Sequence, residues 1–324
     1  MDPSRRRHFT CLPRMSTVLS LTVPFFALIF LGMFCRHIGF VGESDAKTMA
    51  RFAFFIAMPT MVFMKIGAGS ALDFLNWGFI WRYELATIVI FIVAALIARP
   101  LFSLTRLESG IFGLNAAYPN YGYIGVPLAI LALGDEAALP LALILALDTV
   151  VLLVLAGWFA TTSTGAMGQT IRHALATVGR NPLLISAVLG LVYAASGIEM
   201  PTIMAGAFNM VADAAPAVAL FALGATVYGQ PLKKAAGELT AISVARLALH
   251  PALMAVFFLA LPGVDPLWIK AALISACLPV AANVFVLSDN YGGYAGRSAS
   301  AILVTTVVAS VTVPVALYLI MKIA

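Results

Sequence analysis

Ten apolar runs, each about as long as a helix that crosses a bilayer, constrain this chain more than any other feature. The runs cover residues 16–37, 46–65, 77–99, 109–132, 137–160, 181–197, 202–227, 238–261, 267–287 and 298–322. About 20 residues of α-helix cross the hydrocarbon core of a membrane. Hydrophobic residues make up 62% of the chain and charged residues 10%, whereas a soluble domain carries about 25% charged residues. The sequence therefore predicts an all-α integral membrane protein with about ten transmembrane helices.

The two halves of the chain share prolines and glycines in the same order and at nearly the same spacing. The landmarks are Pro24, Gly32, Gly39, Pro59 and Pro119 in the first half, and Pro182, Gly190, Gly197, Pro216 and Pro279 in the second. Five helices are an odd number, so a second copy must enter the membrane from the opposite side. This pattern predicts two inverted five-helix repeats, a common plan of secondary transporters. The first repeat spans 15–160, a linker spans 161–180, and the second repeat spans 181–324.

Lysine and arginine favour one face of the predicted membrane protein. Ten of them lie on the same face as the linker: Arg36, Lys47, Arg51, Arg99, Arg106, Arg172, Arg180, Lys233, Lys234 and Arg297. Four lie on the other face: Lys65, Arg82, Lys270 and Lys322. Because cytoplasmic loops are enriched in Lys and Arg, this bias predicts that the linker 161–180 is cytoplasmic and that both termini lie outside.

The N-terminal tail, residues 1–14, contradicts this rule. It adds Arg5, Arg6, Arg7 and Arg14 to the outer face. One hypothesis is that Met15 is the true start and that the preceding residues come from a mis-called start codon; the other keeps the tail. N-terminal sequencing of the natively expressed protein distinguishes them, since a mature chain that retains Arg5 contradicts the first.

The fourth and ninth runs are not ordinary membrane helices. Residues 113–127 hold Pro119 and Pro127 together with glycines and asparagines, and the ninth run holds Pro279 followed by Asn283. Proline removes a backbone donor and clashes with the preceding turn. In a membrane, the freed backbone groups must find partners inside the protein or in a wet cavity. The two runs are therefore predicted to be broken crossover helices, helices 4 and 9.

A helix that begins inside the membrane presents unpaired N–H groups and a partial positive charge, which together favour an anion. Asn120 and Asn283 lie beside the two breaks, and their amides can donate to a carboxylate. The alternative is that the prolines only shape packing and that the asparagines bond to neighbouring carbonyls. Two breaks at corresponding places in a repeat favour the binding site.

Few ionisable side chains lie within the apolar runs. Asp148 is in the middle of the fifth run and Asp213 is in the seventh. Charges at this depth are normally paired, protonated or exposed to a water path. Each aspartate is therefore either a coupling or gating group or a packed carboxylate with hydrogen-bonding neighbours. His250 directly precedes Pro251, so it is either a third such candidate or a residue at a kink.

The remaining charged residues of the runs are expected near the membrane surface. Arg246 shares a helix face with His250, four residues later, and we expect it to be an interfacial residue of the cytoplasmic side. Glu84 lies near the start of the third run beside Arg82. The two are expected to form an interfacial pair, with gating as the alternative for Glu84.

Several function classes lack their signatures. The net charge of +5 comes from residues at helix ends, which orients a membrane protein and does not indicate nucleic acid. The chain has no His-Glu-x-x-His, no Gly-x-Ser-x-Gly and no glycine-rich phosphate loop with a lysine. Neither intramembrane aspartate has a Gly-x-Gly-Asp pattern, so an intramembrane enzyme is a distant alternative. No cofactor or metal site is expected.

The broken fourth run resembles the auxin efflux carrier family. The likeness rests on residues 115–128, 134–136, 180–184, 246–251 and 278–286, and it extends over nearly all of the chain after Met15. It implies ten helices in which the fourth and ninth cross. It also implies a substrate carboxylate bound at the crossover, by Asn115, Pro119, Asn120, Pro279 and Asn283. Asn283 follows its proline by four residues whereas Asn120 follows directly, which makes Asn283 the weaker candidate.

The short linker resembles bacterial members of the family, some of which are described as malonate or other organic-acid transporters. The resemblance implies a multi-pass protein of the bacterial inner membrane, with periplasmic termini, that carries small carboxylates by alternating access. Helices 3–5 and 8–10 would move against a scaffold of helices 1, 2, 6 and 7. A sodium- or proton-coupled antiporter or symporter of the same architecture is the alternative. The coupling ion, proton or sodium, and a homodimer as the assembly stay open.

Overall fold

The computed structural model describes residues 15–68, 76–160, 166–228 and 235–323. The N-terminal tail with its arginines and the basic pair Lys233 and Lys234 lie outside the described residues. The expectations about the start codon and about those two lysines therefore stay expectations.

Helices dominate the part of the chain that the structure describes. The α-helices are α1 (Met15–His37), α2 (Glu43–Phe52), α3 (Met58–Gly67), α4 (Trp77–Leu101), α5 (Arg106–Ala117), α6 (Val126–Leu133), α7 (Ala138–Ala160), α8 (Ala166–Gly179), α9 (Pro182–Ser196), α10 (Thr202–Tyr228), α11 (Ala236–Val244), α12 (His250–Leu259), α13 (Pro266–Ala276), α14 (Asn283–Asn290) and α15 (Ala295–Ile320). Two π-helical turns join pairs of them, η2 (Ala53–Ala57) and η6 (Ala245–Leu249), and a third, η4 (Tyr121–Gly125), directly precedes α6. A 3-10 turn, η5 (Asp135–Ala137), precedes α7.

The helices confirm a multi-pass membrane protein. Among the described residues, seven helices are long and apolar enough to cross a membrane, and eight if the pair Gly168–Gly179 and Pro182–Ser196, bent by 57°, counts as one span. Two shorter apolar helices, Tyr121–Leu133 and Pro266–Ala276, belong to the predicted fourth and ninth runs. The predicted linker 161–180 contains a helix of 14 residues, α8. It packs against α7, the last helix of the first half.

Local signals begin several of these helices. Asn181 caps α9 because its side chain accepts a hydrogen bond from the N–H of Leu183, and Pro182 occupies the first turn. Asp265 caps α13 through the N–H of Leu267, again with a proline in the first turn. Thr105 begins α5 with a reciprocal capping box to Glu108. The caps at Thr105 and Asp265 fix the starts of α5 and α13, the two helices that run toward the breaks.

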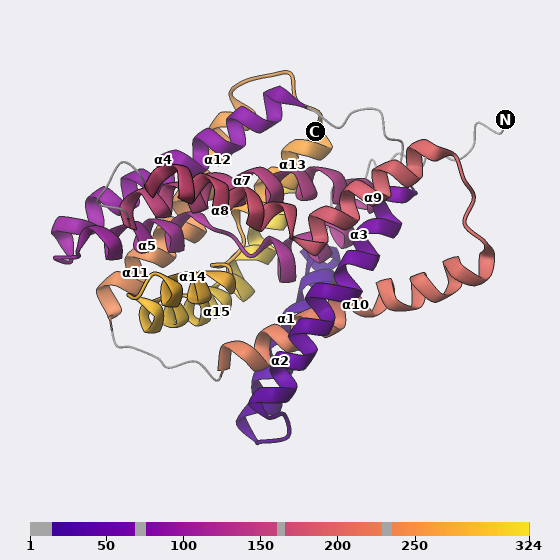
Figure 1. The fold of residues 1–324 in the computed structure, drawn as a ribbon, viewed down its shortest axis with the longest axis horizontal. Helices are drawn as coiled ribbons and strands as arrows, with labels where there is room; N and C mark the ends of the chain where they lie inside the picture. The colour runs from indigo at the N-terminus through magenta and orange to yellow at the C-terminus, as the bar shows by residue number, and fades with distance from the viewer. Residues whose placement is uncertain (1–14, 69–75, 161–165, 229–234, 324) are drawn as a thin grey trace.

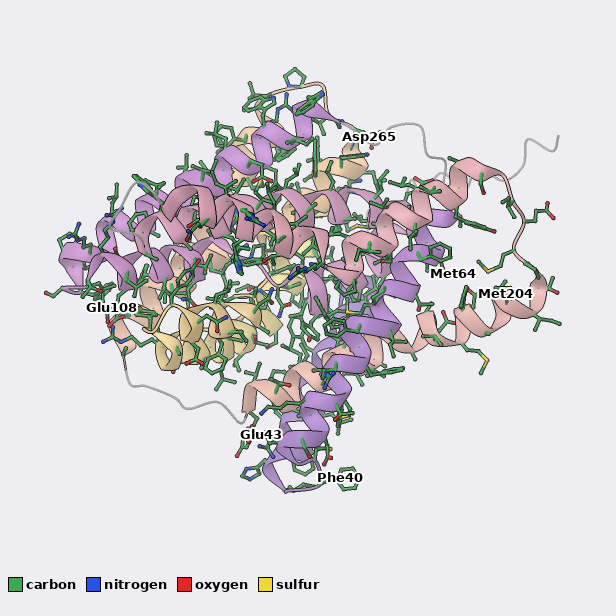
Figure 2. All side chains as sticks on the ribbon, viewed as in Figure 1. Phe40, Glu43, Met64, Glu108, Met204 and Asp265 are labelled. Carbon is green, nitrogen blue, oxygen red and sulfur yellow. The ribbon has the colours of Figure 1, made fainter. Side chains whose placement is uncertain are left out.

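The helices form two groups (Figure 1). In one group α10 packs against α1, α2 and α3, and α9 packs against α3. In the other group α4, α5, α7, α12, α13 and α15 pack against one another, with α11 and α14 at the side of α15. Large apolar side chains cover the outside of both groups, including Phe40 and Met204 at the periphery of Figure 2. Such a surface is unusual in a soluble protein and suits contact with lipid.

Two pairs of matching glycines play the same part in each half. Gly39 and Gly197 follow the ends of α1 and α9, and both have positive φ, 76° and 65°, a conformation that glycine adopts without strain. Gly32 and Gly190 both allow close approach of a neighbouring helix. A Cβ at Gly32 would lie 2.1 Å from the carbonyl oxygen of Phe221, and one at Gly190 would lie 3.0 Å from that of Phe63. In each half the first helix thus contacts the second helix of the other half.

A first prediction tests this close packing. Gly224→Ala should destabilise the protein by about 1–3 kcal/mol, because its Cβ would lie 1.9 Å from the carbonyl oxygen of Ile29 and must push α1 from α10. Thermal unfolding in detergent measures the effect. Gly206→Ala is the matched control, since it lies on the same helix with nothing within 4 Å of its Cβ. Equal midpoints for both variants would show that the α1–α10 contact tolerates separation.

Candidate functional site

The two predicted breaks meet in the interior of the protein. α5 ends at Ala117 and helical structure resumes at Tyr121, while α13 ends at Ala276 and helix resumes at Asn283. The extended segments pair as an antiparallel bridge between Pro119 and Val280. The N–H of Asn120 donates to the carbonyl oxygen of Pro279 at 3.0 Å, and that of Ala281 donates to Tyr118 at 3.0 Å. The bridge satisfies backbone groups that lipid would leave unpaired.

Asn120, which directly follows the paired residue Pro119, offers a side-chain hydrogen-bond donor that no other described residue uses. Its side-chain oxygen accepts a hydrogen bond from the N–H of Tyr123 at 3.3 Å and so caps the helical segment that begins at Tyr121. Its amide nitrogen is buried and has no hydrogen-bond partner among the residues that the structure describes. The residue lines a cavity of about 20 Å³ beside the bridge. Because the amide cannot turn without losing the cap, its N–H groups remain directed away from the capped helix.

The lining of this small cavity comes from both helix groups. Tyr118, Asn120 and Asn283 belong to the broken segments, whereas Phe54 and Asn181 belong to η2 and the start of α9. The ring of Phe54 stacks on that of Tyr123, with centroids 6.1 Å apart. A displacement of one group against the other therefore changes the size of the cavity.

A larger cavity of about 470 Å³ adjoins the small one. Phe54, Tyr123 and Asn283 line both. Its other polar lining includes Lys47, whose ammonium group lies 2.6 Å from the carboxylate of Glu43. Asn283 is exposed to this space, and its amide nitrogen lies 3.4 Å from the hydroxyl of Tyr118. The larger cavity is wide enough for a small molecule to approach the bridge.

Arg246 lies behind the bridge and corrects one expectation. It was expected at the membrane interface, yet its side chain is fully buried. Its guanidinium donates to the carbonyl oxygens of Ala117 at 2.7 Å and Leu278 at 2.9 Å, and also to that of Ala276. Ala117 and Ala276 are the last residues of α5 and α13, and Leu278 follows α13 by two residues. The C-terminal end of a helix carries a partial negative charge. The helix ends meet a cation there, and this tertiary contact outweighs the cost of burying an arginine.

His250 extends this contact toward α4. Nη1 of Arg246 donates to Nδ1 of His250, and Nε2 of His250 lies 3.3 Å from the hydroxyl of Thr87. Arginine has no acceptor, so Nδ1 must accept and Nε2 must carry the hydrogen. His250 is fully buried. The sequence placed it at a proline kink or in a functional role, and the structure brings it to the cluster behind the bridge.

The acidic candidates separate into two places. Asp148 is fully buried, and within the described part of the chain neither of its carboxylate oxygens has a hydrogen-bond partner. Thr87 and Arg246 face it. Glu84 acts electrostatically on Asp148 from α4. Asp213 instead lies exposed on α10, apart from this cluster.

The expected pair of Glu84 and Arg82 is wrong for the described residues. Arg82 donates to the carbonyl oxygen of Pro262 at 2.8 Å, and no ion pair joins it to Glu84. Residues separated by two positions point to different sides of a helix, which explains the difference.

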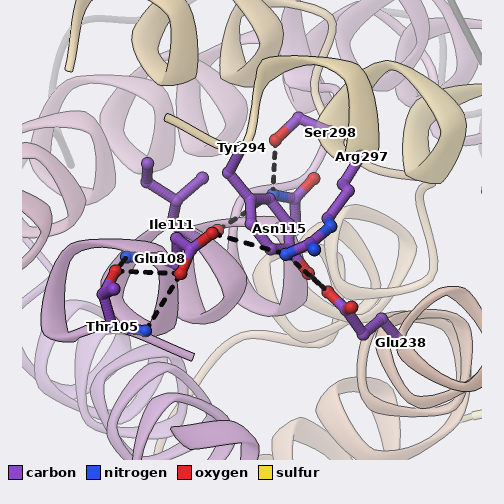
Figure 3. Close-up of polar contacts among 8 residues, drawn as sticks. All are labelled: Thr105, Glu108, Ile111, Asn115, Glu238, Tyr294, Arg297 and Ser298. Carbon is purple, nitrogen blue, oxygen red and sulfur yellow. Dashed lines mark hydrogen bonds and ion pairs between the residues drawn. The ribbon is translucent and has the colours of Figure 1, made fainter. Parts of the chain in front are cut away.

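Asn115 lies deeper in α5 and makes contacts within the second helix group (Figure 3). Its amide nitrogen donates to the carbonyl oxygen of Ile111 and to the hydroxyl of Ser298, both at 2.9 Å. It lines neither the small nor the larger cavity. Its role as a substrate ligand stays a prediction, and its observed contacts tie α5 to α15.

Charged residues join the starts of three helices near Asn115 (Figure 3). Nη1 of Arg297 lies 3.5 Å from a carboxylate oxygen of Glu108 and 3.5 Å from one of Glu238. The hydroxyl of Tyr294 donates to Glu238, and the guanidinium of Arg297 lies 5.0 Å from the Tyr294 ring. The cluster ties α5, α11 and α15 together at one end of the second group.

A second prediction concerns the pH dependence of this cluster. Hydrogen bonds from Thr105 hold the pKa of Glu108, which precedes the predicted span 109–132, below its usual value, with Arg297 as a further cause. The ionised group therefore contributes stability above the ordinary carboxyl pKa, and the contribution is lost as the pH falls through the lowered pKa. Glu108→Gln should lower the thermal midpoint at pH 7 but not at pH 3. A midpoint difference that persists at pH 3 would assign the effect to packing.

Some residues of the site were not predicted. Asn181 and Phe54 line the small cavity, and Thr87 connects His250 to Asp148. The apolar run 181–197 was predicted to be a helix, but nothing in the sequence indicated that its start faces the bridge. The shared helix face of Arg246 and His250 was visible in their spacing, whereas their depth was not.

Comparison with known proteins identifies the family of this chain. A family model described as "Membrane transport protein" matches residues 17–164 and 167–317. A "Putative malonate transporter" of Rhizobium meliloti is 34% identical over 311 residues, which cover 94% of this chain and 97% of that protein. The "Uncharacterized transporter YfdV" of Escherichia coli is 21% identical over 91% of this chain. A "Probable auxin efflux carrier component 1b" of Oryza sativa is 31% identical over 130 residues, 38% of this chain and 23% of its own.

The family and these relatives are transporters and not enzymes, which agrees with the missing catalytic signatures. The matched residues include both broken segments and the arginine that closes their helix ends. The chain belongs to the auxin efflux carrier family of membrane transport proteins.

Proposed function

We propose that this protein carries small carboxylates, with malonate as the first candidate, across the bacterial inner membrane by alternating access. The observation that carries the proposal is the unpartnered amide nitrogen of Asn120. It lies at the start of a helical segment inside the protein, beside two cavities. A helix start favours negative charge, and a carboxylate accepts hydrogen bonds without offering any. The malonate candidate comes from the Rhizobium meliloti relative.

The proposed substrate site is the bridge region. The carboxylate binds to the amide of Asn120, with Asn283 as a second donor from the other broken segment. Pro119 and Pro279 hold the two segments extended: Pro119 is one of the two paired residues, and Pro279 directly precedes the other, Val280. Asn115 supports the site from within α5.

Alternating access in this proposal uses ten membrane helices in two inverted repeats. The matching glycines of α1 and α9 and the pairing of the two breaks support the repeat. The second helix group, with α4, α5–α7 and α11–α15, moves against the first, with α1–α3, α9 and α10. The small cavity of about 20 Å³ is lined from both groups, so their displacement admits the substrate. The linker and Lys47 lie on the cytoplasmic side, and the termini lie in the periplasm.

Uptake into proteoliposomes tests this function directly. Radiolabelled malonate and related carboxylates should enter liposomes that contain the protein at a saturable rate, and unlabelled substrate should compete. Liposomes with Asn120→Ala protein are the control for leak. The absence of saturable flux for every carboxylate would contradict the proposal.

Sodium coupling is the alternative that the structure disfavours. Crossover transporters coordinate sodium with unwound carbonyls and the C-terminal ends of half-helices. Here Arg246 occupies the carbonyls of Ala117, Ala276 and Leu278. Replacing sodium by choline on both sides of the membrane should therefore leave the uptake rate unchanged. A sodium gradient that drives accumulation by itself would establish the alternative.

A further inference from the structure

Two acidic side chains, the buried Asp148 and the half-buried Glu84, have no part in the proposed substrate site. Asp148 lies on α7 with its side chain fully buried, and both carboxylate oxygens lack hydrogen-bond partners. Glu84 on α4 has one buried carboxylate oxygen without a partner. An ionised carboxylate without donors is costly inside a protein, and more so in a membrane. These two carboxylates therefore need a cation or a proton that neutralises their charge.

Arg246 acts electrostatically on Asp148, but no hydrogen bond joins the two side chains. A guanidinium has five N–H groups. In Arg246, Nε donates to the carbonyl oxygen of Leu278, Nη2 donates to that of Ala276, and Nη1 donates to that of Ala117 and to His250, with the carbonyl oxygen of Ala116 at 3.5 Å. None is donated to Asp148. Arg246 therefore attracts the carboxylate through space without binding it.

The hydrogen-bond direction in this cluster also leaves Asp148 short of donors. Because Nε2 of His250 carries a hydrogen that points to Thr87, the hydroxyl hydrogen of Thr87 is free to turn toward Asp148. That supplies at most one donor to a group with two oxygens. The other groups that act on the carboxylate are Glu84, Tyr83 and Tyr118. Glu84 repels it when ionised. The hydroxyl of Tyr83 lies 3.0 Å from that of Ser275, and the hydroxyl of Tyr118 lies 3.2 Å from that of Thr149.

Two carboxyl groups that act on each other inside a protein, as Asp148 and Glu84 do, do not both ionise readily. If both were charged, the buried cluster of Arg246, Asp148 and Glu84 would be net negative, whereas one proton makes it neutral. Close carboxyl groups share a proton for this reason. Arg82 does not balance the charge, because it turns to Pro262. We propose that Asp148 and Glu84 form a proton-binding site and that the substrate anion moves together with that proton.

The position of the pair suits this role. α4, α7 and α12 belong to the helix group that carries the broken segments, so a bound proton moves with the substrate site. Glu84 lies in the first third of α4, toward the end where Arg82 meets Pro262. In the proposed orientation this end faces the periplasm, which gives the proton an entrance from the outside. The proton-binding site does not depend on the proposed transport function, whereas the movement of the proton with the substrate rests on it.

Infrared spectroscopy of the purified protein tests the proton site without a substrate. At pH 7 the wild type should show the carbonyl band of a protonated carboxyl group, and Asp148→Asn and Glu84→Gln should each reduce it. Asp213→Asn is the matched control, because this aspartate also lies in a long apolar helix but is exposed and apart from the cluster. Equal bands in the wild type and both cluster variants would overturn the proposal.

Transport tests the coupling. With one proton per substrate, each pH unit of outside-acid gradient should raise malonate accumulation by up to about tenfold in the wild type. Asp148→Asn should lose this response but keep exchange of internal for external malonate, which needs no net proton movement, and Asp213→Asn should respond like the wild type. Accumulation in the wild type that ignores the gradient would overturn the coupling. If no carboxylate is transported, the proposed function fails, and the infrared result still decides the proton site.

Discussion

Asn120→Ala is expected to reduce malonate affinity by about 10- to 100-fold. A hydrogen bond to a charged acceptor contributes about 1.5–3 kcal/mol, and about 1.4 kcal/mol corresponds to a factor of ten. The amide nitrogen of Asn120 is unpartnered in the free protein, so its loss breaks no internal contact. Loss of the helix cap to Tyr123 costs about 1 kcal/mol of stability. Binding to the detergent-solubilised protein, followed by scintillation proximity, measures the affinity.

Asn120→Asp separates binding from capping. Aspartate keeps an oxygen that can accept from the N–H of Tyr123, so the helix start and the thermal midpoint should be retained. It replaces the amide donor with a negative group, and malonate binding should fall further than in Asn120→Ala. Asn209→Ala, an exposed position on α10, should bind like the wild type. Unchanged affinity in both Asn120 variants would show that the anion binds elsewhere.

Arg246→Ala is expected to have the largest effect on stability, at least about 3 kcal/mol. Removing the guanidinium leaves the carbonyls of Ala117, Ala276 and Leu278 without the donor that closes them. A buried group left unsatisfied costs about 1–3 kcal/mol. Thermal unfolding in detergent measures the loss. The thermal midpoint of Arg246→Lys should lie between those of the wild type and Arg246→Ala. The lysine ammonium keeps the charge but lacks the planar guanidinium that reaches both helix ends.

Two controls decide whether the charge at the helix ends causes this effect. Millimolar guanidinium should raise the midpoint of Arg246→Ala by occupying the vacated position, and it should not raise that of the wild type. Arg82→Ala removes another buried arginine, whose guanidinium donates to a single carbonyl oxygen, that of Pro262, and should cost less. If Arg82→Ala and Arg246→Ala unfold at the same temperature, the closing of the helix ends is not the dominant interaction.

Much of the fold follows from local sequence. The apolar runs placed the helices, because the cost of unpaired backbone groups in lipid leaves little else for about 20 apolar residues to do. The breaks near Pro119 and Pro279 were predictable since proline cannot continue the hydrogen-bond ladder. The helix within 161–180 was not predicted, because its polar and apolar residues resemble a connecting segment. The pairing of the two breaks as a backbone bridge required both halves in place.

The depth and partners of the charged residues could not be predicted from the sequence. Arg246 has the spacing of an interfacial residue, yet it is buried because the carbonyl ends of α5 and α13 converge on it. Glu84 and Arg82 are near neighbours in sequence, but they turn to different partners.

By itself, the sequence determined that this chain crosses the membrane many times and that two of its helices break, because backbone hydrogen bonding in lipid is a local constraint. Only the tertiary structure decided which groups those breaks meet. Asn120 keeps an unused donor beside the cavities, and Arg246 closes the two helix ends behind them. Charge and hydrogen-bond complementarity depend on distances between residues far apart in the chain, and the fold alone sets those distances.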